Sequence, residues 1–208
     1  ASIDEMPIDR FFGKGVCFDM RHIGDLGDID VADMEKAEAE SGVKVDGHII
    51  LLCTGLHKRH YPNREVVLSN AGITVAATQW MYDRGSRLHG VEGPSTDKPS
   101  DSLFAQHRIC RELGISHMEW LVNLEDLIGL GEFEFFGVPL RFKGGSGSPI
   151  RAFAIVLDDE VISAPVIQAH IAGLPETAHA RLKELGDTEP AGLLHLPIVR
   201  AKHAVCGR

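Results

Sequence analysis

The chain has 208 residues, a formal net charge of −9 at pH 7, and ordinary shares of apolar and charged residues. This length suits one globular domain with a short appendage, and it is long enough to bury a substantial core. The acidic balance argues against a nucleic-acid surface, which requires a basic face. No apolar run is long enough to span a membrane and no signal-peptide pattern opens the chain, so we predict a cytoplasmic protein that binds neither nucleic acid nor membrane.

The cysteines are scattered and form no Cys-x-x-Cys pair; they are Cys17, Cys53, Cys110 and Cys206. At this length and density a disulfide framework is not expected. Cys17 and Cys53 lie in apolar, strand-like runs, where a cysteine usually serves as a small buried hydrophobic residue.

The first half of the chain alternates strand and helix patterns. Residues 15–20 predict a short buried strand, after a lead-in whose Phe11 and Phe12 are both expected to pack onto the domain. Asp30 can cap a helix that ends at Gly42. Residues 48–55 contain a continuous apolar run and predict a central strand buried on both faces.

The second half continues this alternation. Thr74 is the expected cap of a helix that ends at Gly85, and a strand over residues 87–91 leads into a polar turn. The helix after that turn, capped by Asp101 or Ser102, is expected to end at Gly114. The strands expected after it start near Ile115 and then cover residues 132–136, 138–142 and 151–157. This order of elements is typical of an α/β domain.

His107 is expected on the last of these helices and Glu119 on the following strand. An imidazole and a carboxylate from adjacent elements are natural ligands for a divalent metal. Spacing alone does not separate such a site from two solvated side chains, because the chain has 11 histidines. Glu92 and Asp97 flank Pro94 in the preceding turn; they could orient metal ligands or water, or serve ordinary turn chemistry.

Other patterns carry less chemical information. His57 and His60 are spaced for one helical face, but a zinc site needs more partners, so we expect residues 57–61 to form a polar loop beside a substrate pocket. Thr54-Gly55 is a turn where backbone can approach a ligand closely. The loop over residues 144–148 is expected to be a tight connection; it lacks the ending of a phosphate-binding loop, and Ser146 does not stand in a Gly-x-Ser-x-Gly elbow.

A family resemblance rests on the turn Gly-Val-Glu-Gly-Pro-Ser-Thr-Asp at residues 90–97, on His107 followed by Glu119, and on the runs at residues 119–124, 138–140 and 144–152. From about Ser2 to Ile155 the chain resembles the cyclase-type family of metal-dependent hydrolases, which includes bacterial kynurenine formamidase and isatin hydrolase. The resemblance implies a swivelling β/β/α fold, usually assembled as a homodimer, with His107 and Glu119 as metal ligands.

The sequence departs from the family pattern at one place. The family's other metal ligands come from a His-x-Gly-Thr-His-x-Asp-x-Pro motif, which this sequence does not contain. Its first residues resemble the segment that follows this motif, so we expect a domain that is incomplete at its N-terminus. That domain is expected to cover residues 1–162, followed by a C-terminal extension over residues 163–208 with one short helix near 175–185.

Two functional hypotheses follow from the resemblance. The first is a hydrolase of a small cyclic or aryl amide, of the kynurenine formamidase or isatin hydrolase type, which uses a zinc or manganese ion held by His107 and Glu119. The second is a non-catalytic, truncated relative that serves as a binding or oligomerisation domain. The metal content of the protein separates the two hypotheses.

Overall fold

The computed structural model describes residues 2–157 and 199–200. The chain divides into two units, with the boundary at residues 156 and 157. In the second unit the strand β9 (Val199–Arg200) is described. The expected helix at 175–185, and nearly all of the expected C-terminal extension, lie outside the described residues. The domain boundary at residue 162 stays a prediction.

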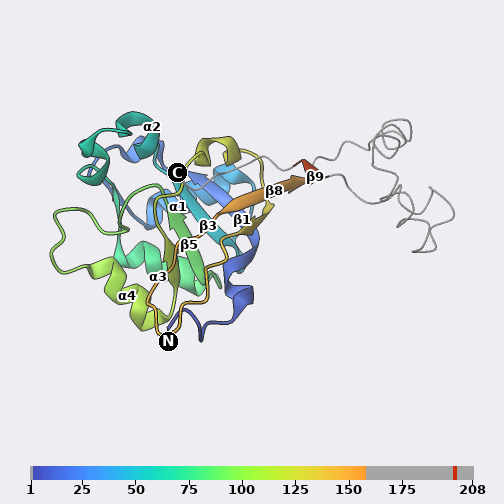
Figure 1. Ribbon diagram of the computed structural model, residues 1–208. Coiled ribbons are helices and arrows are strands. Elements are labelled where there is room, and N and C mark those ends of the chain that lie inside the picture. Colours follow the sequence, from blue (N-terminus) through green and yellow to red (C-terminus); the bar gives the residue numbers. More distant parts are fainter. Residues whose placement is uncertain (1, 158–198, 201–208) are drawn as a thin grey trace, which may run out of the picture. The chain divides into compact units, whose positions relative to one another are not determined.

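A mixed sheet organises the first unit (Figure 1). Its strands follow the order β6-β5-β3-β1-β7-β8; the first four are mutually parallel, whereas β7 and β8 are antiparallel to their neighbours. The predicted α/β class is confirmed. The bounds of these strands are β1 (Phe12–Asp19), β3 (Ile49–Cys53), β5 (Leu88–Val91), β6 (Ser116–Met118), β7 (Phe133–Phe136) and β8 (Phe153–Leu157).

Helices and a small second sheet surround these strands. The second sheet pairs β2 (Asp28–Ile29) with β4 (Gly72–Ile73). The predicted cap at Thr74 is confirmed, because its hydroxyl accepts a hydrogen bond from the Ala77 N–H at 3.1 Å. The helices are α1 (Val31–Ser41), α2 (Leu56–His60), α3 (Val75–Asp83) and α4 (Ala105–Leu113), and the 3₁₀ turns are η1 (Ile8–Phe11), η2 (Arg21–Ile23), η3 (Arg64–Val67) and η4 (Leu124–Leu127).

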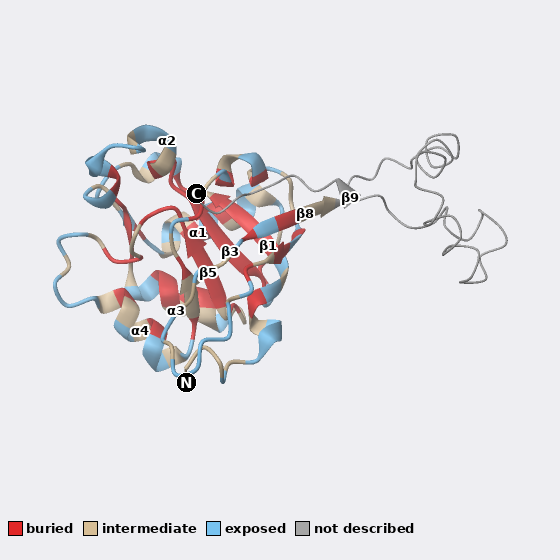
Figure 2. Ribbon diagram, viewed as in Figure 1, coloured by how far each residue is buried: buried red, intermediate tan, exposed pale blue. Residues whose placement is uncertain are grey.

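Side-chain alternation along the strands separates two apolar cores on opposite faces of the sheet. On one face, α1, α3 and α4 pack against the strands through residues such as Met34, Met81 and Cys110. On the other face, η1 and η4 cover the sheet through Phe11 and Leu127. Strand β3 is buried at every position, as its continuous apolar run predicted, and Figure 2 shows it among the buried central strands.

The N-terminal strand is longer than expected. β1 begins at Phe12, because the segment Phe12–Gly15 pairs antiparallel with β7 before the strand turns to its parallel neighbour β3. Phe11 is buried, as expected. Phe12 is 40% exposed, and its ring stacks on that of Phe136 with 5.9 Å between the ring centroids.

Two local predictions are wrong. Residues 57–61 were expected as a loop, but most of them belong to the short helix α2. Residues 138–142 do not form a strand: Pro139 makes only an isolated bridge to Ile150, and the Leu140 N–H donates to the Ser148 hydroxyl at 2.8 Å. Proline cannot donate to a sheet ladder, so it interrupts pairing at this position.

A buried carboxyl group joins the ends of β3 and β5. Glu92 is fully buried, and its Oε2 accepts hydrogen bonds from the Thr54 hydroxyl at 2.9 Å and from the Gly55 N–H at 2.5 Å. Its other oxygen, Oε1, has no hydrogen-bond partner in the part of the chain that is described. Burial raises the pKa of the Glu92 carboxyl above its ordinary value.

Two further features of the described residues concern the length of the helices and the state of the cysteines. None of the described helices combines the length and the apolar character needed to cross a bilayer. Cys17, Cys53 and Cys110 are buried free thiols, as the apolar surroundings of Cys17 and Cys53 predicted for those two. Burial raises the pKa of the Cys110 thiol to about 12.

Replacing Glu92 is expected to affect stability in two distinct ways. Glu92→Ala leaves the Thr54 hydroxyl and the Gly55 N–H without their acceptor and opens a cavity, so it should lower the free energy of unfolding by about 2–4 kcal/mol. Glu92→Gln keeps an acceptor oxygen and should preserve the fold. Guanidinium unfolding at pH 7 measures both values.

The raised pKa of Glu92 determines the direction in which folding stability changes with pH. Because the folded-state pKa is raised, the folded wild-type chain holds this proton longer than the unfolded chain, and it loses stability as the pH rises past the ordinary carboxyl value. Glu92→Gln cannot lose a proton. Its stability relative to wild type should therefore improve between pH 4 and pH 7, by about 1.4 kcal/mol per unit of raised pKa. Glu35→Gln, on the exposed side of α1, is the matched control; an equal pH response in both variants would contradict the assignment.

Candidate metal centre

Asp97 connects the turn after β5 to the first turn of α4. Its carboxylate is 4% exposed. Oδ1 accepts the Gln106 N–H at 2.7 Å, and Oδ2 accepts the His107 N–H at 3.3 Å and also contacts Nδ1 of the His107 ring. Asp97 thus satisfies two helix N-terminal donors and orients the ring, which leaves Nε2 of His107 facing away from it. This contact supports the hypothesis that Asp97 orients a metal ligand.

The expected cap of α4 is shifted in the structure. Asp101 accepts hydrogen bonds from the N–H groups of Leu103 at 2.8 Å and Ala105 at 3.1 Å, so it organises the approach to the helix. The helix itself begins only at Ala105, because Phe104 has a left-handed backbone with φ of 51°. The predicted end of the helix at Gly114 is confirmed.

The short strand β6 determines where Glu119 lies. Glu119 follows β6 directly, and it shares one side of the chain with His117, whereas Met118 between them packs into the opposite core. Trp120 and Asn123 have φ values of 60° and 59°. These left-handed conformations end the extended backbone, so the strand expected to carry Glu119 stops one residue before it.

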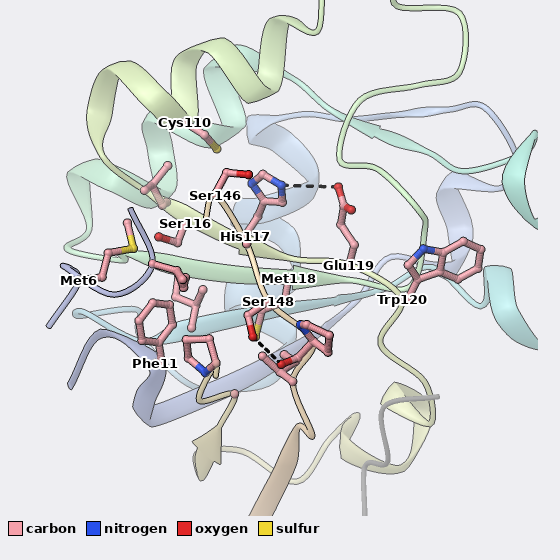
Figure 3. A pocket seen from close by; sticks show the side chains of 18 of the residues that line it. Met6, Phe11, Cys110, Ser116, His117, Met118, Glu119, Trp120, Ser146 and Ser148 are labelled. Carbon is pink, nitrogen blue, oxygen red and sulfur yellow. Dashed lines mark hydrogen bonds and ion pairs between the residues drawn. The ribbon is translucent and has the colours of Figure 1, made fainter. Parts of the chain in front are cut away.

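Three donor side chains converge at this edge of the sheet. Nε2 of His107 lies 3.7 Å from Oε1 of Glu119, and Nε2 of His117 lies 3.5 Å from the same oxygen. The centroids of the two imidazole rings are 4.6 Å apart, and the ring planes meet at an angle of 77°. One potential ligand atom from each side chain lies within 4.8 Å of the others, and all three residues are half-buried. Figure 3 shows His117 and Glu119 directed toward one another.

The structure therefore brings together the two residues expected to bind a metal and adds His117 to them. Sequence reasoning did not single out His117. The available signal was its period-two spacing from Glu119, which places two residues on one side of a strand. That spacing becomes informative only once α4 is known to present His107 to the same side.

A cavity of about 1180 Å³ adjoins these three side chains at the outer edge of β6. The N-terminal segment, α2 and the glycine-serine loop contribute to its walls, and the lining includes His57, Tyr61, Trp120, Ser146 and Ser148. The expectation that residues 57–61 border a pocket is confirmed, although these residues start in a helix. Several of the lining residues are labelled in Figure 3.

The two histidines of α2 have different surroundings. His57 stacks on Tyr61, with 4.5 Å between ring centroids, and lines the cavity. His60 instead pairs through Nε2 with Oδ2 of Asp25 at 2.7 Å. The two side chains therefore contact different partners in the described residues.

A neutral histidine lies behind the candidate centre. His89 on β5 pairs in register with His117 on β6, and the centroids of their rings are 5.9 Å apart. Burial lowers the pKa of His89 to about 3, and the neighbouring rings of His117 and His107 contribute further. At neutral pH this ring therefore adds no charge behind the three donors.

A second group of potential ligands comprises Cys53, Glu92 and Glu125. Burial raises the pKa of both the Cys53 thiol and the Glu92 carboxyl above their ordinary values, which opposes their ionisation. The hydrogen bonds of Glu92 go to Thr54 and Gly55. The hypothesis that Glu92 orients a metal ligand is not supported by these contacts, which give it a structural role in the Thr54-Gly55 turn.

Sequence comparisons place the chain among known proteins. The family model described as "Putative cyclase" matches residues 1–98, a stretch that ends before His107. Kynurenine formamidase from Bacillus cereus is 30% identical over 134 residues, which are 63% of this chain and 62% of that protein. Kynurenine formamidase from Erythrobacter litoralis is 25% identical over 156 residues, which are 74% of this chain and 65% of that protein. The chain thus spans 62% of the length of the first of these curated relatives.

Solved structures share the fold. Isatin hydrolase A from Labrenzia aggregata superposes with a TM-score of 0.65 at 24% identity, covering 73% of this chain and 64% of that one. The crystal structure of a novel cyclase gives a TM-score of 0.64 at 25% identity, covering 74% of this chain and 56% of that one. The N-terminal family match, the sequence relatives and the common fold agree with the resemblance expected from the sequence: the chain is similar to proteins of the cyclase family.

Proposed function

We propose that this chain forms the catalytic part of a metal-dependent hydrolase that acts on a small cyclic or aryl amide. The observation that carries the proposal is the convergence of His107 and Glu119 beside the large cavity, with Nδ1 of His107 held by Asp97. The names of the relatives, kynurenine formamidase and isatin hydrolase, favour the same class of substrate.

The residues present fit a divalent cation. An imidazole nitrogen and a carboxylate oxygen are suitable ligands for zinc or manganese, and both face a cavity with room for a substrate. When bound, such a cation supplies Lewis-acid chemistry, because it polarises a carbonyl group and makes water a stronger acid. Asp97 contributes by holding the His107 ring in one orientation, with Nε2 on the side of Glu119.

The cavity walls suit a flat, partly apolar substrate. The stacked rings of His57 and Tyr61 lie on one wall, and Phe11 and Trp120 add further aromatic surface. Aromatic walls bind aromatic rings through stacked or edge-to-face contacts. These walls would hold the ring of an aryl amide, while the serines of the glycine-serine loop offer hydroxyl groups for hydrogen bonding. The homodimer and the cytoplasmic location stay predictions.

Metal content tests the proposed ligands directly. The purified chain, loaded with zinc or manganese, is expected to retain about one or more ions per chain and to hydrolyse N-formylkynurenine or isatin. His107→Ala and Glu119→Ala should each lose the tightly bound ion and reduce turnover by about 100-fold or more, since each removes a direct ligand. Elemental analysis after dialysis gives the stoichiometry, and absorbance assays follow the hydrolysis of both substrates.

The matched control for these variants is His22→Ala. His22 also pairs with a carboxylate, Asp33, at 3.0 Å, but it lies outside the residues that line the cavity. It should leave metal content unchanged. If the wild-type chain held no metal above background even after reloading, the hydrolase proposal would be abandoned in favour of a non-catalytic relative.

The contact between Asp97 and the His107 ring can be tested through metal affinity. Asp97→Asn removes the charge that holds Nδ1, so it should weaken metal affinity by about 10–100-fold while leaving the direct ligands in place. Competition with a chromophoric chelator measures the affinity, and a thermal melt without metal checks the fold.

Asp33→Asn is the control for this variant. Asp33 is also a carboxylate at the start of a helix and contacts a histidine, His22, but that pair lies away from the cavity. The expected affinity of this control is that of wild type. Equal affinities for Asp97→Asn and wild type would show that Asp97 serves only the helix.

A further inference from the structure

We propose that His117 is the third protein ligand of the metal centre, so that His107, His117 and Glu119 hold the cation as one set within residues 107–119. The inference rests on the proposed function and adds a ligand to the same site. Catalytic zinc sites usually have three protein ligands and one open position. His107 and Glu119 alone would supply two.

The position of His117 in the sheet directs it to the site. β6 pairs in parallel with β5, and in this register His117 lies beside His89. Because side chains alternate along a strand, His117 is on the same side as Glu119, while the buried Met118 faces the opposite core. The alternation therefore gives His117 and Glu119 a common direction, and α4 brings His107 to it.

Distances agree with a shared cation. Ligand atoms around a tetrahedral zinc ion, at bond lengths of 2.0–2.2 Å, lie about 3.3–3.6 Å from one another. Oε1 of Glu119 is 3.5 Å from Nε2 of His117 and 3.7 Å from Nε2 of His107. The ligand nitrogens of His107 and His117 lie within 4.8 Å of each other. A small rotation of the His117 side chain would bring its nitrogen to the separation expected around a zinc ion. The His107 ring is already held by Asp97.

The contacts of His117 leave its ring available for this role. In the described part of the chain, the ion-pair partner of His117 is Glu119, which is itself a member of the proposed set. The side chain of His117 is 23% exposed, and it lines the cavity. Solvent and a substrate can therefore reach these side chains from the cavity.

The assignment also distinguishes the two candidate groups in this chain. In the group of Cys53, Glu92 and Glu125, burial raises the pKa of two members, Cys53 and Glu92. The group that includes His117 is half-buried and adjoins the cavity. Binding a cation there requires neither breaking the hydrogen bonds of Glu92 nor ionising a buried thiol.

The test measures metal affinity and coordination, not activity. The full chain and its His117→Ala, His117→Gln, His107→Ala, Glu119→Ala and His22→Ala variants are titrated with Zn²⁺ against a chromophoric chelator. Both His117 variants are expected to weaken Zn²⁺ binding by about 100-fold or more, since even residues that only orient ligands change affinity 10–100-fold. His22→Ala should bind as wild type does. The Gln variant keeps the bulk of the side chain, and melts without metal confirm that each variant is folded.

Substitution with Co²⁺ gives a second readout. A four-coordinate Co²⁺ ion absorbs visible light far more strongly than a six-coordinate one, so the wild-type chain should show intense bands that weaken in both His117 variants. If His117→Ala and His117→Gln kept wild-type affinity and spectrum while His107→Ala and Glu119→Ala lost the ion, the His117 assignment would be overturned and the proposed function would stand. Absence of metal binding in the wild-type chain would overturn both.

Discussion

The carboxylate of Asp97 holds the functional edge of this protein together. It is nearly fully buried, and it satisfies two N–H groups at the start of α4 while it contacts the ring of His107. A negative charge is favourable at this end of a helix because the free N–H groups and the helix dipole are both positive there. One side chain thus sets where the helix begins, how it meets the turn after β5, and which nitrogen of His107 faces the cavity.

The sheet separates two groups of potential ligands by their surroundings. Each group includes residues at the carboxyl end of a parallel strand, where binding sites of α/β sheets usually form. Cys53 is buried on the face covered by η4, Glu92 is also fully buried, and burial raises the pKa of both groups. His117 and Glu119 lie at the edge strand, where the sheet opens to a cavity. Glutamate, which both groups contain, therefore supports the fold at Glu92 and suits ligand binding at Glu119.

The family match and the candidate site come from different parts of the chain. The family model covers residues 1–98 and so accounts for most of the parallel sheet. The three donor side chains lie after it, within residues 107–119. Because the chain spans 62% of the Bacillus cereus relative, the proposed activity rests on the geometry of these donors. Three ligands within a short stretch would let this part of the chain bind a cation by itself.

The sequence by itself determined the features that depend on local interactions. The apolar run of β3, the Thr74 cap and the glycines that end α1 and α4 follow from burial and backbone preferences of a few neighbouring residues. The family resemblance pointed to His107 and Glu119, whose side chains do converge. Local sequence patterns wrongly predicted a strand at residues 138–142, because Pro139 cannot donate to a neighbouring strand. They also placed the start of β1 too late, because the pairing partner of Phe12 lies more than a hundred residues away in β7.

Only the tertiary structure decided the roles of His117, Asp97 and Glu92. In the sequence, His117 is one of 11 histidines, and its spacing of two residues from Glu119 is too common a pattern to identify a ligand. It becomes a candidate ligand because the register of β6 against β5 and the position of α4 bring its ring 4.6 Å from that of His107. Asp97 and Glu92 read alike as turn carboxylates, yet one contacts the His107 ring and the other supports a buried turn. The difference lies in which distant segments pack against each carboxylate, and packing of that kind is set by the whole fold.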